Sequence, residues 1–456
     1  MSIKKIVEGG YCIGCGLCNK SLDQKTEIKF DKFGQYQLTS KDSQPLDDSE
    51  NSKALEVCPF SGKGPDENDI GKLDYSESSN HDHRIGYYKD LYVSHVKNRE
   101  ERKKSTSGGI ITFIAKQLLE RKLVDYVVHV KKDESEDSNA MFSYGISDNI
   151  NELERNTKSR YYPIEMSKVV ETMREIPGRY LVIGLPCFIK GVKRLAAVDS
   201  IINERVKFTI GLVCGHLKSK GFSEMYAVQS GIPPEKLKNI DFRVKNDSGT
   251  ARTYSVLVEG DGTSVVKRSN EFYGTHWGYN FFRYSACDYC DDVFAETADI
   301  SVGDAWLDGY IDDPMGNSVV VVRNKTIGLI MKEAQQNNLL FTESISADLA
   351  AKSQAGGIRD RRSGLSFRLY LKQKAKKWAP KKRVEPTKGN LKFFRKLILK
   401  NRIVLRENSH YYWLKSKRKE DFNYFKRKMS FYVHRNSILY LLSNNISDII
   451  RSIKRL

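Results

Sequence analysis

The sequence of 456 residues lacks long hydrophobic runs, and no stretch approaches the roughly 18 to 20 apolar residues that a membrane-spanning helix needs. Its N-terminus, MSIKKIVEGGYC, has no apolar segment of the kind found in secretory signals, so we expect a cytoplasmic protein. No G-x-G-x-x-G motif lies between a predicted strand and helix, and G-x4-G-K-[ST] is absent. Rossmann-type nicotinamide binding and P-loop hydrolysis therefore have no support. Hydrophobic residues at 39% and charged residues at 29% exclude collagen-like and fully disordered proteins.

Acidic residues are scarce at one end of the chain. Residues 351–456 contain 30 Lys and Arg against 6 Asp and Glu, a net charge of +24, whereas the whole chain carries +19. The remaining part is therefore slightly acidic, and a basic segment of this kind is attracted to anionic surfaces.

Three partners could account for the basic segment. An anionic membrane surface, bound peripherally through residues 385–456, is our first expectation because apolar side chains alternate with the basic ones. These side chains are Phe393, Phe394, Leu397, Ile398, Trp413, Phe422, Phe425, Phe431 and Tyr432. An acidic protein or an anionic glycan is the second expectation. Nucleic acid is the least favoured partner because no recognised nucleic-acid motif accompanies the charge.

The pattern of apolar and polar residues predicts three parts. Residues 1–75 are loop-rich, with a β-hairpin predicted over residues 27–38. Residues 61–84 are polar with scattered glycine and are predicted to form a linker. Strands and helices alternate over residues 85–345, and β-hairpins are predicted within residues 241–270. This alternation predicts a mixed α/β core.

The last part, residues 351–456, is expected to be a basic helical extension. Pro380 and Pro386 mark a break, and three helical segments are predicted after it. The expected fold class is thus α/β (mixed α+β), with a small N-terminal module, a central mixed-sheet domain and a basic α-helical C-terminal tail.

Eight cysteines fall into two sets of four. Cys12, Cys15 and Cys18 form C-x2-C-x2-C, a spacing at which three thiolates on a tight loop can bind three corners of a 4Fe-4S cluster. Gly14 and Gly16 would let the backbone wrap closely. Cys58 is the only nearby candidate for the fourth ligand, 40 residues further on. A structural zinc site and incidental thiols are the alternatives, and the second half of a two-cluster ferredoxin motif is missing.

The second set is spread along the central part. Cys287 and Cys290 form a C-x2-C pair, while Cys187 and Cys214 follow predicted strands. Functional sites lie at the ends of strands in α/β sheets, so a second 4Fe-4S cluster is the favoured hypothesis. A zinc site, a redox-active pair and buried core thiols stay open as alternatives.

The segment from Ser105 to Gly109, STSGG, follows a basic run and precedes a predicted helix. Backbone N–H groups at a helix N-terminus bind anions, so the segment could hold phosphates, although a capped polar loop is the simpler interpretation. Asp304 ends a predicted strand and could bind a cofactor or cap a turn. His216, beside Cys214, is a further candidate.

The motifs STSGGIITFI, GLPCFIKGVKRL, FTIGLVCGH, CDYCDDVFAETADISVGDAW and GNSVVVVR together resemble the beta subunit of coenzyme F420 hydrogenase and dehydrogenase. The N-terminal C-x2-C-x2-C resembles the ferredoxin-like module often fused ahead of it. The resemblance covers about residues 8–335. It implies 4Fe-4S clusters and FAD, with electrons passing from a ferredoxin-like one-electron donor to a two-electron acceptor. Some bacterial relatives occur in surface-polysaccharide gene sets, which makes a small-molecule or glycan-related substrate an expectation.

The resemblance also implies roles for particular residues. The loop residues Ser105, Ser107, Gly108 and Gly109 would hold flavin phosphates, and Lys158 and Ser159 would lie beside the flavin. Gly184, Pro186 and Cys187 would lie near the flavin ring and the second cluster, which Cys214, Cys287 and Cys290 would complete. Two alternatives remain: an electron-transfer subunit without its own substrate, and a zinc-bearing nucleic-acid-binding protein.

Overall fold

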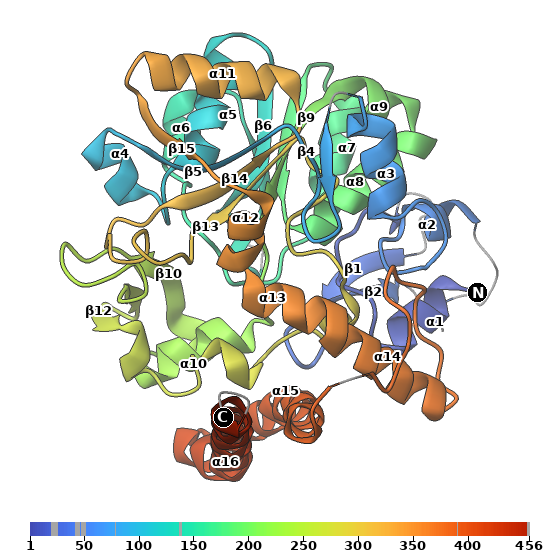
Figure 1. Ribbon diagram of the computed structural model, residues 1–456, viewed down its shortest axis with the longest axis vertical. Coiled ribbons are helices and arrows are strands. Elements are labelled where there is room, and N and C mark those ends of the chain that lie inside the picture. The colour runs from blue at the N-terminus through green and yellow to red at the C-terminus, as the bar shows by residue number, and fades with distance from the viewer. Residues whose placement is uncertain are drawn as a thin grey trace.

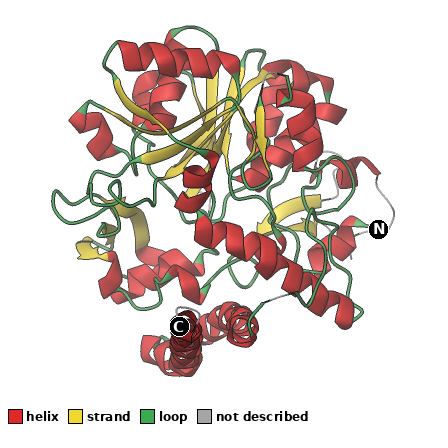
Figure 2. Cartoon of the chain, in the orientation of Figure 1, coloured by secondary structure: helices red, strands yellow, loops and turns green. Residues whose placement is uncertain are grey.

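The computed structural model describes residues 1–19, 26–41, 46, 52–77, 79–135, 139–389 and 391–453. Within them, a central mixed sheet of eight strands has helices on both faces (Figures 1 and 2). The strand order is β15-β5-β14-β13-β9-β8-β6-β7. The strands are β5 Asp90–Val96, β6 Tyr126–Lys132, β7 Phe142–Ser147, β8 Tyr180–Gly184, β9 Val206–Leu212, β13 Ile300–Asp304, β14 Ser318–Val322 and β15 Leu340–Ser344. The predicted α/β class is confirmed.

The middle of the sheet is parallel. Strands β6, β8, β9 and β13 pair in parallel, while β7, β14 and β15 pair antiparallel to their neighbours. Every residue of β14 is buried, as its Val-rich sequence requires for a strand covered on both faces. The strands predicted in this part of the chain are all present.

Two helical layers cover the sheet. Helices α5 (Ile110–Glu120) and α11 (Lys325–Gln336) pack on one face, where Ile110, Ile114 and Leu118 recur at helical spacing and are buried. The other face is covered by α7 (Ser167–Glu175), α8 (Pro186–Val198) and α9 (Ser200–Arg205), which share a core with the N-terminal module (Figure 1). The short helices α4 (Arg99–Lys104) and α6 (Ile150–Glu154) complete this part.

The N-terminal module contains α1 (Ile3–Glu8), α2 (Ser52–Val57) and a hairpin of β1 (Thr26–Phe30) and β2 (Tyr36–Ser40). The hairpin confirms the prediction for residues 27–38. The predicted linker over residues 61–84 is wrong in part, because it contains α3 (Glu67–Tyr75) and the pair β3 (Asn80–Asp82) and β4 (Gly86–Tyr88). Asp66 and Asp69 form a capping box at the start of α3, and Ile70 and Tyr75 are buried, which explains why this polar stretch is ordered.

A smaller sheet lies beside the central one, as predicted for residues 241–270. It consists of β10 (Leu237–Val244), β11 (Ser255–Gly260) and β12 (Thr263–Arg268), all antiparallel, next to α10 (Gly221–Gln229). Aromatic residues of this region, including Phe242, Phe272 and Phe281, form a buried cluster.

The C-terminal part is helical, as predicted, but it is not a separate tail. Helices α12 (Ala347–Ser353), α13 (Ala355–Arg359) and α14 (Leu365–Lys374) cross the body, and α15 (Phe393–Lys419) and α16 (Phe422–Ile453) form an antiparallel pair beneath it (Figure 1). Three helices were expected after Pro386, whereas the described residues form two, with the chain reversing at Glu420 (φ +51°).

Several apolar side chains of this part are buried against the body rather than available to lipid. Trp413 and Phe425 are 4% and 0% exposed, and Trp413 donates a hydrogen bond to Glu224 at 2.8 Å. Ile398 is 1% exposed. The expectation that these three side chains contact a membrane is therefore wrong, because Trp413 and Phe425 fill the aromatic cluster beside the small sheet and Ile398 is equally enclosed. Within the described residues, every helix is too short or too polar to cross a bilayer.

Candidate functional site

A cavity of about 250 Å³ opens at the carboxyl ends of the parallel strands. It is lined by residues that follow β8 and β9, by Gly303 and Asp304 at the end of β13, and by the loop before α5. Strand β5 is antiparallel to β14, which is antiparallel to β13, so β5 delivers this loop to the same edge. Ligands of open α/β sheets bind at this edge, which makes the cavity the candidate ligand site.

The cavity gathers most of the residues that the sequence suggested for a cofactor. Ser105, Ser107, Gly109, Lys158, Ser159 and Asp304 line it. Gly108, Gly184 and Pro186 do not, although each is adjacent in the chain to a residue that does. The roles of all nine stay predictions.

The loop before α5 is held in place by its own hydroxyl groups. Ser105 donates to the Glu101 carbonyl at 2.9 Å, and Ser107 donates to the Asn317 carbonyl at 2.9 Å. Gly109 has φ +85° and leaves the N-terminus of α5 without a side-chain cap. The hydroxyl protons of Ser105 and Ser107 are thus already used, and backbone N–H groups at the start of α5 could bind a ligand phosphate.

Basic side chains surround this loop. Lys158 pairs with Asp241 at 3.0 Å, and Arg243 pairs with Asp304 at 2.7 Å. Lys245 donates to the Ser107 carbonyl at 2.7 Å. Burial, together with nearby cations, lowers the pKa of Lys245 to about 7. Two of these three basic side chains are thus balanced by carboxylates.

Aromatic side chains form another part of the cavity lining, and most of them were missed from the sequence. The rings of His216 and Tyr161 lie 4.4 and 5.1 Å from that of Trp277, centroid to centroid. His216 is 8% exposed, and its Nε2 has no hydrogen-bond partner among the described residues. Lys218 is buried, donates to the Phe281 carbonyl at 2.6 Å and lies 4.9 Å from the Trp277 ring centre. Only the position of His216 beside Cys214 gave a signal in the sequence.

The structure brings the four N-terminal cysteines together. Burial raises the pKa of Cys18 well above its ordinary value, and the thiols of Cys58, Cys15 and Cys12 raise it further. Burial raises the pKa of Cys58 to about 11, with Cys12 adding to the shift. Cys58 is therefore next to the C-x2-C-x2-C loop in space, despite its distance along the chain.

Glycine is required in this loop for steric reasons. A Cβ on Gly14 (φ +64°) would lie 2.3 Å from the Tyr36 carbonyl oxygen, and one on Gly16 (φ +78°) would lie 2.8 Å from Glu165. The loop is thus pressed between β2 and the segment before α7. The Gly14 N–H donates to the Cys12 sulfur at 3.3 Å.

The other four cysteines also form one group, called here the distal quartet: Cys187, Cys214, Cys287 and Cys290. Burial raises the pKa of Cys187, and the other three thiols add to the shift. Cys214 lines the cavity, so the distal quartet borders the candidate ligand site. The Leu217 N–H donates to the Cys287 sulfur at 3.3 Å.

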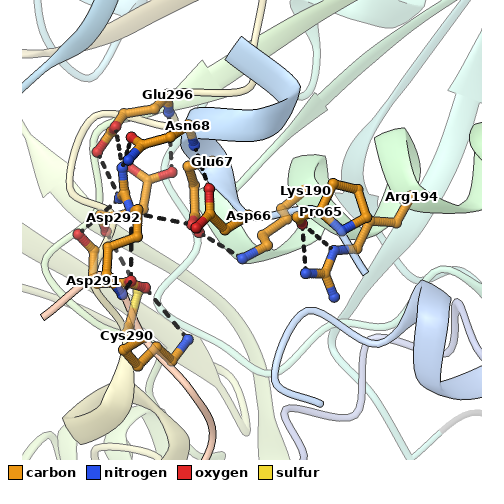
Figure 3. A network of polar contacts seen from close by, with 12 residues as sticks. Pro65, Asp66, Glu67, Asn68, Lys190, Arg194, Cys290, Asp291, Asp292 and Glu296 are labelled. Carbon is orange, nitrogen blue, oxygen red and sulfur yellow. Dashed lines mark hydrogen bonds and ion pairs between the residues drawn. The ribbon is translucent and has the colours of Figure 1, made fainter. Parts of the chain in front are cut away.

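The two quartets are neighbours. The Cys15 thiol contributes to the raised pKa of Cys187, which belongs to the other quartet. A buried polar network also lies beside them, containing the Lys190–Glu67 pair at 3.0 Å, the Lys382–Asp291 pair at 3.3 Å and the Arg383–Glu296 pair at 2.6 Å (Figure 3).

The donor set of each quartet is four thiols, which fits a 4Fe-4S cluster and also a zinc ion. Among the described residues, no group of three or more His, Cys, Asp or Glu side chains is arranged to hold a single metal ion. The thiols of each quartet nevertheless influence one another's pKa. Four thiolates complete a 4Fe-4S cluster, so the residues of each quartet fit that group.

Comparisons with known proteins identify a family, described as "Coenzyme F420 hydrogenase/dehydrogenase, beta subunit". Residues 91–171 match its N-terminal part, and residues 178–348 match its C-terminal part. No curated protein matches. A chain of the F420-reducing [NiFe] hydrogenase complex from Methanosarcina barkeri is 19% identical, over 64% of this chain and 96% of that one, with a TM-score of 0.48. Because the two family matches together span more than half of the residues, the chain belongs to the coenzyme F420 hydrogenase/dehydrogenase beta subunit family, a family of oxidoreductases.

Proposed function

We propose that this protein is an iron–sulfur flavoprotein oxidoreductase. Loaded with two 4Fe-4S clusters and FAD, it would take single electrons from a ferredoxin-like donor and reduce a two-electron acceptor. The observation that carries this proposal is the position of the two cysteine quartets, which neighbour each other while the distal one borders the cavity.

Separate groups of residues would bind the two clusters and FAD. Cys12, Cys15, Cys18 and Cys58 would hold the first cluster, and the distal quartet would hold the second. The N-terminus of α5, with Lys158 and Ser159, would bind the phosphates of FAD. When bound, FAD supplies the conversion between one-electron and two-electron transfer.

Side chains of the protein give the cavity polar and apolar surfaces for a ligand. Arg243 holds Asp304 in an ion pair at 2.7 Å, which fixes both side chains at the wall. Trp277 and Tyr161 provide an apolar surface that excludes water and against which a planar ring can pack. The unpartnered His216 Nε2 is available to hydrogen-bond a ligand.

The acceptor in this proposal is a small molecule. F420 and a glycan-related compound are the two candidates for the acceptor. Neither the family match nor the cavity favours a surface polysaccharide. An electron-transfer subunit without its own substrate would need only an exposed flavin edge, and it stays the alternative, because the cavity is already assigned to FAD.

The test is to purify the protein without oxygen and to count iron, sulfide, zinc and flavin per chain. Two clusters and one FAD predict about eight iron atoms and one flavin. Cys290→Ser should lower the iron content to about four and leave the N-terminal cluster. Zinc without flavin, or iron that is unaffected by Cys290→Ser, would contradict the proposal.

We also propose peripheral binding of an anionic membrane through the outer face of α16. Phe431, Ile438 and Leu441 are 66%, 43% and 62% exposed on this face. Exposed basic residues, including Arg427 and Lys428, flank it. Apolar contact combined with basic charge is the arrangement that interfacial helices use.

A further inference from the structure

Arg361, between α13 and α14, is a buried cation without a carboxylate partner. Its residue is 2% exposed, and its Nη2 donates to the carbonyl of Gly215, next to Cys214, at 2.9 Å. Among the described residues, no Asp or Glu forms an ion pair with it. Burial opposes the charge of Arg361, whereas the thiols of Cys290, Cys214 and Cys287 raise its pKa. An isolated buried charge is costly, so this arginine requires anionic sulfur nearby.

Lys382, on the segment between α14 and α15, reaches both quartets. Its side chain is 5% exposed and lies 3.3 Å from Asp291, the residue after Cys290. Its Nζ lies 4.7 Å from the ring centre of Phe60, two residues after Cys58. Lys382 also lowers the pKa of Cys58 against the larger effect of burial. One ammonium group therefore acts on a ligand of each proposed cluster.

Both residues lie beyond residue 348, where the family match ends. They belong to the basic C-terminal part, whose charge the proposed electron transfer does not by itself explain. Tyr11, beside the first cysteine loop, is also bound by this part, since its hydroxyl donates to the Trp378 carbonyl at 2.8 Å.

We propose that Arg361 and Lys382 are positioning residues that set the reduction potentials of the two clusters, with Arg361 acting on the distal cluster and Lys382 on both. The inference rests on the proposed function, since it requires both clusters. Each one-electron reduction adds a negative charge to a buried cluster, and a fixed buried cation stabilises the reduced form more than the oxidised form.

The experiment is a potentiometric titration of the full-length, anaerobically purified protein, followed by electron paramagnetic resonance. The variants are Lys382→Met and Arg361→Met, with Lys382→Arg and Arg361→Lys as charge-preserving variants. Lys381→Met and Arg359→Met serve as matched controls, because both residues are exposed and close in the chain to the tested positions.

We expect Arg361→Met to lower the reduction equilibrium constant of one cluster by at least tenfold, which is 59 mV for a one-electron couple. Lys382→Met should lower the reduction equilibrium constants of both clusters. In the charge-preserving variants, these constants should stay within a few-fold of those of the wild-type protein. If a Met variant loses iron, retention of iron by its charge-preserving counterpart supports the proposal, and loss in both overturns it.

Unchanged potentials in iron-loaded Lys382→Met and Arg361→Met would overturn the inference and leave the proposed function intact. Equal shifts in Lys381→Met and Arg359→Met would overturn it as well, because a general effect of surface charge would then suffice. A wild-type protein without iron would instead refute the proposed function itself.

Discussion

Gly108 offers a sharp test of the phosphate-binding loop because backbone atoms surround it. A Cβ at this position would lie 2.5 Å from the Ser94 carbonyl oxygen, 2.8 Å from the Ser318 hydroxyl and 3.0 Å from the Ser318 nitrogen. Two of these three atoms belong to the backbone of β5 and β14, in the central sheet, and cannot move cheaply. In Gly108→Ala the loop must therefore leave its position, and the hydrogen bond from the Gly108 N–H to Ser318, at 3.1 Å, is lost.

Overpacking of this kind costs about 1 to 3 kcal/mol. If the loop must regain its native position to bind FAD, the affinity of the protein for FAD falls by about 5- to 140-fold, at 1.4 kcal/mol for each factor of ten. Fluorescence titration of flavin-free protein with FAD measures the change.

Gly356→Ala is the matched control. It lies in α13, where an added Cβ would meet no atom within 4 Å, so alanine should stabilise the helix by about 0.5 to 1 kcal/mol and leave FAD binding unchanged. A folded Gly108→Ala protein that binds FAD as tightly as the wild-type protein would refute the assignment of this loop to the flavin phosphates.

Three further predictions concern other parts of the molecule. Serine at Phe431, Ile438 and Leu441 should abolish flotation with anionic vesicles without lowering the melting temperature, whereas unchanged flotation would exclude the outer face of α16. Because Lys245 has a pKa of about 7 in the folded protein, the unfolded chain binds more protons between pH 7 and about 10. Stability should thus rise with pH across this window in the wild-type protein, and Lys245→Met should reduce the rise in urea titrations. Truncation after residue 389 should lower solubility and melting temperature, because it removes Leu405, Trp413, Phe425 and Met429 from the aromatic cluster; a truncated protein as stable as the full chain would contradict this.

Much of the fold could be predicted because its strands are short, apolar and separated by helices of clear periodicity. The Val-rich strand β14 and the helix α5, with Ile110, Ile114 and Leu118 on one face, are examples. Helix α3 was missed because its nine residues are mostly polar, and its start is fixed by the Asp66 capping box rather than by an apolar face.

The candidate site could be predicted only where residue spacing carries chemistry. The C-x2-C-x2-C loop and the C-x2-C pair predict thiol ligands from their spacing, and the structure brings Cys58 and Cys187, already candidates from the sequence, close to them. Trp277, Tyr161 and Arg243 gave no signal, because they reach the cavity from separate elements that only the folded chain brings together.

The basic charge of the C-terminal part, which looked uniform in the sequence, serves two different environments in the structure. Arg361, Lys382 and Arg383 are buried beside the cysteines and carboxylates of the body. Arg427 and Lys428 face outward on α16. Deleting the whole extension would remove the buried cations, uncover the aromatic cluster and abolish any surface contact at the same time. A loss of membrane binding after such a deletion would therefore have no single cause. Substitutions confined to the outer face of α16 test membrane contact separately from the buried contacts, because they leave Trp413, Phe425 and the buried cations in place.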